Sequence, residues 1–244
     1  MARRLNQPPP PPVFAQIMSQ PDLVIFDFDG TLVDSEIIAA RVEAGLITAA
    51  GFPIEAEELA ERYAGLTFKD ILMEIEREAA IPFQASLLGE AERLVDKRLS
   101  SEVRATEGAR EAVASVPYPK CVCSNSSKHR IEAMLGRTGI LPLFGGNIFS
   151  AKEPPVQKPK PAPDVFLHGA QTMGARPEAC FVVEDSVHGV HAAKAAGMRV
   201  IGFTGNSHSY PGLADALTDA GAETVINRWP DFLPVLAALS DWRD

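Results

Sequence analysis

The sequence has no long apolar run, only three cysteines, and fewer basic than acidic residues. Because no uninterrupted apolar stretch approaches the ~20 residues that a helix needs to cross a bilayer, we expect no membrane partner. The net charge of −9, from 32 acidic and 23 basic residues, disfavours a nucleic-acid partner, since phosphate backbones are bound chiefly through Lys and Arg. Cys121, Cys123 and Cys180 lie in apolar, strand-like contexts, which predicts buried free thiols in a reducing, cytoplasmic compartment rather than disulfides.

Residues 1–20 differ in composition from the rest of the chain. Arg3 and Arg4 precede the prolines from Pro8 to Pro12, and no apolar segment of the kind found in secretory signals follows them. This composition predicts an extended, mobile tail, in which Met18 is a candidate for the native start.

From Leu23 onward, short apolar runs alternate with longer segments of helical period. We predict strands at residues 23–28, 120–123, 147–149, 180–184, 199–203 and 224–226. We predict helices between the later strands, at residues 127–135, 163–173, 187–196 and 213–220. This alternation is typical of a parallel sheet with helices on both faces, so the predicted fold class is α/β with a Rossmann-like core.

The region of residues 36–105 interrupts that alternation, because it contains no convincing strand. Its apolar periodicity predicts three helices, over residues 37–50, 68–79 and 87–99. We therefore expect an all-helical cap of residues 36–105, inserted into a core of residues 21–35 and 106–244 and lying over the mouth of the sheet.

The first predicted strand stops at two carboxylates, Asp27 and Asp29, which Gly30 and Thr31 follow at once. A single residue separates the two acids, so the turning chain brings both to one cavity, where a carboxylate pair is unfavourable unless a cation neutralises it. Hard oxygen ligands suit Mg²⁺, and a carboxylate beside Mg²⁺ can attack the phosphorus of a phosphate ester. An ordinary acidic turn after a strand is the alternative interpretation.

Two further predicted strands also end in polar residues. Ser124 and Asn125 follow one of them, and Glu184 and Asp185 stand at the end of another. Because parallel strands share a carboxyl edge, we expect these residues to converge with Asp27. Ser124 and the following amides offer donors to phosphate oxygens, while Glu184 and Asp185 would complete a Mg²⁺ site. For each set, the alternative is that the residues only cap the following helix.

Two lysines, Lys158 and Lys160, alternate with prolines in the segment before the helix of residues 163–173. A lysine fixed among prolines loses less conformational freedom when it engages a charged partner. It therefore suits a counter-ion for a phosphate and for an attacking carboxylate, and we choose Lys160 for this role. A solvated loop is the alternative.

These segments resemble the four ordered motifs of the haloacid dehalogenase-like superfamily. The matching segments are Asp27-Phe28-Asp29-Gly30-Thr31, Ser124-Asn125, Lys160-Pro161-Ala162-Pro163-Asp164 and Glu184-Asp185-Ser186-Val187-His188-Gly189. The helical cap after the first motif fits as well. Within the superfamily, the chain is similar to the β-phosphoglucomutase and phosphoglycolate phosphatase branch.

The resemblance implies a role for each matching residue. Asp27 would be the nucleophile that forms an aspartyl-phosphate, and Asp29 would protonate the leaving alcohol and then activate water. Ser124 and Lys160 occupy phosphate-binding positions. The Mg²⁺ ligands that the resemblance implies are Asp27, the main-chain carbonyl of Asp29, Asp185 and, as a further contributor, Glu184.

Departures from the family pattern favour one reaction over others. Dehalogenases of the family lack an acid where Asp29 stands, so Asp29 favours phosphoester cleavage, in which an alkoxide must be protonated. The mutases carry a histidine ten residues further on, where this chain has Ala39, so hydrolysis is expected rather than transfer back to a sugar. We predict a Mg²⁺-dependent phosphatase acting on a sugar, sugar-acid or polyol phosphate. The alternatives are a β-phosphoglucomutase-like mutase and a non-catalytic phosphometabolite sensor.

Three polar residues are candidates for further contact with the substrate. These are Asn125 after its strand, Lys128 at a helix start and Lys69 in the predicted cap, and the alternative for the lysines is a solvated position. The expected partner is a small phosphorylated metabolite, and we expect a monomer or a small homo-oligomer.

Overall fold

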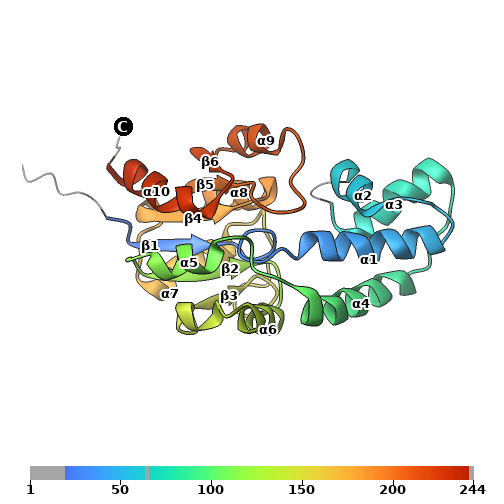
Figure 1. The fold of residues 1–244 in the computed structure, drawn as a ribbon, viewed down its shortest axis with the longest axis horizontal. Helices are drawn as coiled ribbons and strands as arrows, with labels where there is room; N and C mark the ends of the chain where they lie inside the picture. The colour runs from blue at the N-terminus through green and yellow to red at the C-terminus, as the bar shows by residue number, and fades with distance from the viewer. Residues whose placement is uncertain (1–19, 64–65, 242–244) are drawn as a thin grey trace, which may run out of the picture.

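The computed structural model describes residues 20–63 and 66–241, and its centre is a six-stranded parallel sheet (Figure 1). The strands are β1 (Leu23–Phe26), β2 (Lys120–Ser124), β3 (Ile148–Ser150), β4 (Cys180–Glu184), β5 (Arg199–Phe203) and β6 (Thr224–Ile226). Their order, β3-β2-β1-β4-β5-β6, changes direction at β1, where the carboxyl edge of such a sheet forms a crevice. The predicted α/β class is confirmed, although β1 ends two residues before the predicted limit and β3 begins one residue later.

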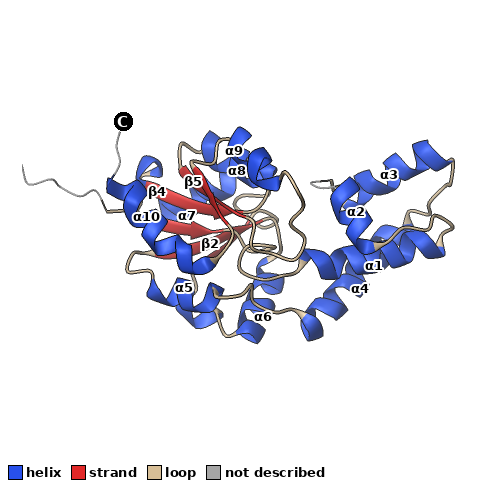
Figure 2. Cartoon of the chain, turned by 45° about the horizontal axis from the view of Figure 1, so that its top comes forward, coloured by secondary structure: helices blue, strands red, loops and turns tan. Residues whose placement is uncertain are grey.

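Helices cover both faces of the sheet, as Figure 2 shows. One face carries α5 (Ala109–Ser115), α6 (Lys128–Thr138) and α10 (Phe232–Asp241), and the other carries α7 (Asp164–Met173), α8 (Val187–Ala195) and α9 (Leu213–Asp219). Short 3₁₀ helices are η1 (Leu141–Phe144), η2 (Pro177–Ala179) and η3 (Trp229–Asp231). The sequence analysis did not predict α5 or α10.

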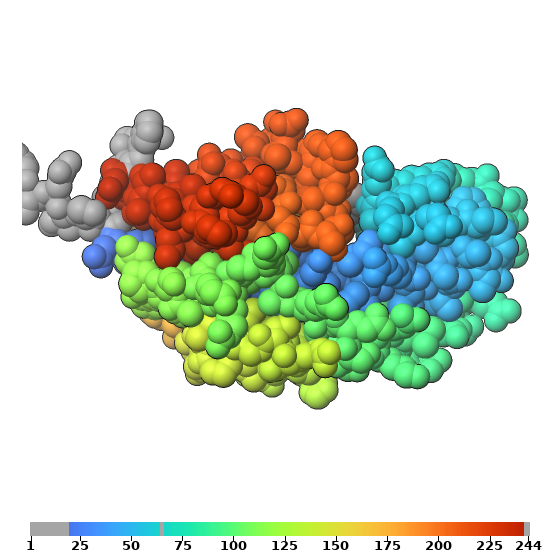
Figure 3. All heavy atoms as spheres, viewed as in Figure 1, coloured from blue at the N-terminus to red at the C-terminus, as the bar shows by residue number. Residues whose placement is uncertain are grey.

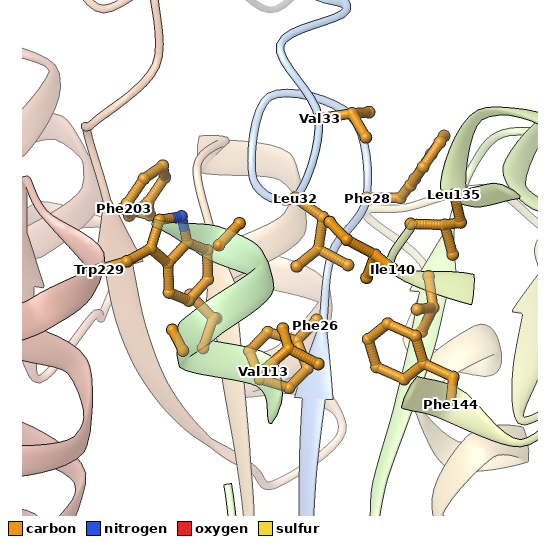
Figure 4. Close-up of a cluster of buried hydrophobic side chains, with 14 of the residues drawn as sticks. Phe26, Phe28, Leu32, Val33, Val113, Leu135, Ile140, Phe144, Phe203 and Trp229 are labelled. Atoms are coloured by element: carbon orange, nitrogen blue, oxygen red, sulfur yellow. The ribbon is translucent and has the colours of Figure 1, made fainter. Parts of the chain in front are cut away.

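The central strand β1 is buried between these two layers because it is apolar on both faces. Val24 and Phe26 point into the first layer, while Leu23 and Ile25 point into the second, as the alternation of side chains along a strand requires. The ring of Phe26 lies 5.9 Å from that of Trp229, centroid to centroid, in the cluster of Figure 4. This packing fixes the point at which the chain leaves the sheet and the acidic residues begin.

Four helices form a separate layer beyond the carboxyl ends of the strands (Figures 1 and 3). They are α1 (Glu36–Ala49), α2 (Ala56–Arg62), α3 (Phe68–Ala79) and α4 (Ser86–Glu102). We call α1 to α4 the cap. It has its own apolar cluster, which includes Ile47, Leu59 and Ile75. The predicted fold of a sheet core with an inserted helical cap is therefore confirmed, with α2 as an additional helix.

The chain enters and leaves the cap along two adjacent segments. Val33 and Ala105 form an antiparallel bridge, the amide of Asp34 donates to the carbonyl of Arg104 at 3.0 Å, and the amide of Thr106 donates to the carbonyl of Leu32 at 3.1 Å. We call these two adjacent segments, with Ser35, the neck of the cap; side chains of α1 and α4 also pack against the core.

Two expectations from the sequence concern the ends of the chain and the bilayer. Residues 1–19, to which the predicted tail belongs, lie outside the described residues. Within the described part of the chain, no helix combines the length and the apolar character needed to cross a membrane.

Candidate active site

The loop after β1 places the first group of predicted residues at the carboxyl edge of the sheet. The amide of Asp27 still donates to the carbonyl of Val183 at 2.9 Å, and the chain then turns back so that the amide of Gly30 meets the carbonyl of Val33 at 2.8 Å. Gly30 has a φ of +76°, and a Cβ there would lie 2.0 Å from Oδ2 of Asp185. Only glycine therefore fits this turn, which brings the loops after β1 and β4 into contact.

Three carboxylates gather where these loops meet. Oxygen atoms of Asp27, Glu184 and Asp185 all lie within 4.8 Å of one another, and the three residues are 7%, 1% and 5% exposed. The ammonium of Lys160 lies 2.5 Å from Oδ1 of Asp27 and 2.6 Å from Oε1 of Glu184, and it donates to the carbonyl of Cys123 at 2.9 Å. We call these four charged residues the acidic cluster.

The acidic cluster is short of positive charge. Burial and the charge of Glu184 raise the pKa of Asp27 well above its usual range, and burial also raises the pKa of Asp185. Burial alone would lower the pKa of Lys160, but the charges of Asp27 and Glu184 more than offset this effect and raise it. One ammonium thus faces three carboxylates, a set of hard oxygen donors that fits a divalent cation such as Mg²⁺.

Lys160 and Lys158 occupy different environments although only one residue separates them. The backbone amide of Lys160 donates to Oδ1 of Asn125 at 2.8 Å, and its side chain passes over the ring of Phe166 with the ammonium 4.7 Å from the centroid. Lys158 instead points to solvent and pairs with Asp164 at 3.0 Å. The structure therefore brings Lys160 to the site and uses Asn125 to hold the backbone of Lys160.

The side chain of Asp29 lies apart from the acidic cluster and is held by serine hydroxyl groups. Ser126 donates to Oδ2 of Asp29 at 2.6 Å and Ser35 donates to Oδ1 at 2.8 Å, while Ser124 makes a longer contact of 3.5 Å to Oδ2. Ser35 belongs to the neck of the cap, so this carboxylate contacts both the core and the neck. The sequence analysis did not predict the contacts of Ser126 or Ser35.

The capping roles considered as alternatives fall to neighbouring residues. The side chain of Ser127 caps α6, whereas the hydroxyl of Ser124 accepts a hydrogen bond from the amide of Ser126 at 2.9 Å. Ser186 caps α8 in the same way, and it donates to Oε2 of Glu184 at 3.0 Å. Ser124, Glu184 and Asp185 are therefore not needed as capping residues.

The two lysines predicted to meet the substrate lie elsewhere. Lys128 pairs loosely with Glu132 along its own helix, at 3.9 Å, and its side chain does not join the acidic cluster. Lys69 is exposed in the first turn of α3. The roles of both lysines in substrate binding stay predictions.

Besides Ser126 and Ser35, the structure adds two more residues that the sequence analysis missed, Asn206 and His208. Asn206 donates to Oδ2 of Asp185 at 3.1 Å, and Nε2 of His208 lies 3.2 Å from the same oxygen. Both residues follow β5, so the rule that polar residues after a parallel strand face the carboxyl edge would have indicated them.

Comparison with known proteins gives a consistent result. A family model described as haloacid dehalogenase-like hydrolase matches residues 21–197. The chain is 32% identical over 198 residues to 6-phosphogluconate phosphatase of Escherichia coli K12, covering 80% of this chain and 87% of that protein. It is 33% identical over 184 residues to hexitol phosphatase B of the same organism, covering 72% and 81%.

A solved structure with greater identity comes from Agrobacterium tumefaciens. It is a conserved haloacid dehalogenase-like protein of unknown function, with 56% identity to this chain and a TM-score of 0.86. The match covers 90% of this chain and 99% of that one. The cap and the sheet core together are therefore similar in the two proteins.

Proposed function

Because this chain belongs to the haloacid dehalogenase-like hydrolase family, we propose that it is a Mg²⁺-dependent phosphomonoesterase acting through an aspartyl-phosphate on Asp27. The observation that carries this proposal is the pairing of Asp27 with Lys160 inside a buried cluster of three carboxylates. A buried excess of negative charge is unfavourable unless a cation balances it, so the cluster suits a metal-assisted reaction on an anionic ester.

Asp27 is placed to act as the nucleophile. Its Oδ1 is held by Lys160 at 2.5 Å, so the carboxylate is fixed in direction before a substrate arrives. In the first step a carboxylate oxygen of Asp27 forms a bond to phosphorus while the bond from phosphorus to the ester oxygen breaks. The carboxyl group of Asp29 donates its proton to the departing alkoxide.

The second step returns the enzyme to its starting state. The carboxylate of Asp29 takes a proton from water, the water oxygen attacks phosphorus, and the bond between phosphorus and Asp27 breaks to release inorganic phosphate. The groups that would hold Mg²⁺ are the carboxylates of Asp27, Asp185 and Glu184 and the main-chain carbonyl of Asp29. When bound, the ion would neutralise phosphate charge and so reduce its repulsion of the nucleophile.

The names of two relatives support the substrate class that we propose. We propose a sugar, sugar-acid or polyol phosphate, because one relative is named a 6-phosphogluconate phosphatase and another a hexitol phosphatase. The cap, for which we propose the boundaries 36 and 105, would cover the phosphate ester and contact its hydroxylated part. A mutase is disfavoured because Ala39 supplies no side chain able to restrain Asp29.

The test is a screen of phosphorylated metabolites with purified protein. We expect Mg²⁺-dependent release of phosphate from aldonate or hexitol phosphates, and no isomerised sugar phosphate. Asp27→Asn should reduce turnover to the blank, whereas Asp215→Asn, an exposed acid on α9, should keep full activity. Retained turnover in Asp27→Asn, or rapid-quench experiments with labelled ester that never label Asp27, would refute the mechanism.

A further inference from the structure

The loop between β5 and α9 reaches the site from a part of the chain outside the four motifs. Its residues Asn206 and His208 contact Asp185, the carboxylate proposed above as a metal ligand. We propose that Asn206 and His208 are positioning residues, which hold Oδ2 of Asp185 so that Oδ1 is presented to the metal. This inference rests on the proposed function, since it assigns residues that serve the same metal site.

The contacts of Asp185 divide unequally between its two oxygens. Oδ2 has two close partners, the amide of Asn206 at 3.1 Å and the ring nitrogen Nε2 of His208 at 3.2 Å. Oδ1 has a single long contact, 3.4 Å to the hydroxyl of Thr31. A carboxylate held in this way has one oxygen occupied and one available, which suits a small cation that binds single oxygens in a strict geometry.

Asn206 also links the two loops that carry the proposed ligands. Its amide nitrogen donates to the carbonyl of Gly30 at 3.0 Å as well as to Asp185. Gly30 directly follows Asp29, whose main-chain carbonyl is a proposed ligand. One amide group therefore sets the separation between a ligand on the loop after β1 and a ligand on the loop after β4.

The ring of His208 has one polar contact among the described residues, and that contact is to Asp185. Its Nε2 faces the carboxylate, while Nδ1 is buried and has no hydrogen-bond partner. The ring also lies against Gly30, where an added Cβ would be 2.6 Å from Cε1 of His208. An apolar side chain could fill the same space without burying an unpartnered ring nitrogen. The specific contribution of the histidine is therefore its contact with Asp185.

The loop is fixed in place independently of the metal site. The amide of Thr204 donates to the carbonyl of Ile226 at 2.9 Å, and Gly205 approaches the backbone of Asn227 so closely that a Cβ would lie 2.6 Å from its carbonyl oxygen. At the other side, Ser207 donates to Oδ1 of Asp34 through its hydroxyl at 2.7 Å. Asn206 and His208 are therefore held on a supported loop, as positioning residues must be.

The test measures metal binding directly, on protein without substrate. Mn²⁺ replaces Mg²⁺ in this experiment, and electron paramagnetic resonance measures the concentration of free Mn²⁺ at each total concentration. Asn206→Ala and His208→Leu should each weaken Mn²⁺ binding about 10-fold or more, the usual effect of removing a group that orients a metal ligand. His208→Gln keeps an N–H near the position of Nε2 and should restore most of the affinity, whereas His191→Gln, on the exposed face of α8, should leave it unchanged.

The Mg²⁺ concentration that gives half-maximal phosphatase activity should rise by the same factor in Asn206→Ala and His208→Leu. Unchanged Mn²⁺ affinity in both variants, with native circular dichroism, would overturn the inference. Should Asn206→Ala not fold, the comparison of His208→Leu with His208→Gln decides alone, because equal affinities would overturn it. If no phosphoester is turned over but metal affinity falls as described, the positioning role stands while the proposed function fails.

Discussion

The buried lysine of the acidic cluster offers the sharpest test of the electrostatic account. Lys160→Met removes the ammonium but keeps an apolar chain of similar length over the ring of Phe166. The variant loses contacts of 2.5 Å to Asp27 and 2.6 Å to Glu184. The side chains involved are 3%, 9% and 1% exposed for Lys160, Asp27 and Glu184, so solvent replaces little of what is lost.

Removing one partner of a buried ion pair costs about 3–5 kcal/mol, because the remaining charge is left uncompensated. For a chain of this size, each kcal/mol lowers the melting temperature by about 2–4 °C, so the expected loss is about 6–20 °C at pH 7. Lys158→Met is the matched control. Lys158 is 66% exposed in its pair with Asp164, so its loss should cost under about 0.5 kcal/mol.

The assay is thermal unfolding of both variants with and without Mg²⁺. In Lys160→Met the carboxylates of Asp27 and Glu184 lose the ammonium that contacts both of them, so added Mg²⁺ should raise the melting temperature more than in the unmodified protein. The deficit should also shrink as the pH falls, because burial and the charge of Glu184 raise the pKa of Asp27, and Asp27 once protonated no longer repels Glu184. Equal melting temperatures for Lys160→Met and Lys158→Met would refute the reasoning.

Three other predictions each concern a single side chain. Ser126→Ala removes the 2.6 Å hydrogen bond to Asp29 and should lower kcat about tenfold, the equivalent of roughly 1.4 kcal/mol. As a control, Ser127→Ala removes the cap of α6 and should lower stability but leave kcat unchanged. Asp96→Asn breaks the 2.5 Å ion pair between Asp96 on α4 and Arg130 on α6. Because this ion pair is partly exposed, the KM of the variant should differ from that of the unmodified protein by no more than about fivefold. Burial and a neighbouring acid on α1 raise the pKa of Glu43 from 4.5 to about 8, so the free energy of unfolding should fall as the pH rises from 4.5 through 8. In Glu43→Gln the decrease in the free energy of unfolding between pH 5 and pH 8.5, measured by thermal unfolding, should be smaller by about 1 kcal/mol. This is less than full burial would give, because the side chain keeps some solvent contact, and an unaltered pH dependence would contradict this account.

The sheet and its ligand-bearing edge were predictable because both depend on local patterns. β4, β5 and β6 match the predicted bounds at both ends, since each is a short, mostly apolar run that a polar residue follows at once. The convergence of Asp27, Glu184 and Asp185 was predicted from parallel strands that end at one edge, whereas Lys160 was chosen for its place among prolines. By contrast, α2 and α5 each carry a single apolar residue besides alanine, Leu59 or Val113, so their sequences show no apolar period that could be recognised.

Other parts of the site depend on contacts that no local pattern encodes. Ser126 and Ser35 are ordinary loop and helix-start serines in the sequence. Ser126 reaches Asp29 from the loop after β2, the neighbour of β1, and Ser35 reaches the same carboxylate from the start of α1. Lys128 was predicted as a substrate contact from its position, and its ammonium lies 3.9 Å from Glu132 four residues along the helix, so its role in substrate binding stays a prediction. Such choices depend on side-chain direction and on neighbours distant in sequence.

The bridge between Val33 and Ala105 has a consequence for how this protein can diversify. Because both ends of the inserted helices start at this bridge, a replacement segment needs two ends equally close together, and it also needs apolar side chains that pack against the core as Ile38 and Leu99 do. A chimaera in which the corresponding part of a relative replaces residues 34–104 should keep its nucleophile and metal ligands in register. Its preference for the alcohol part of the phosphate ester should become that of the donor protein. Recombination at this single junction would thus alter selectivity without rebuilding the chemistry.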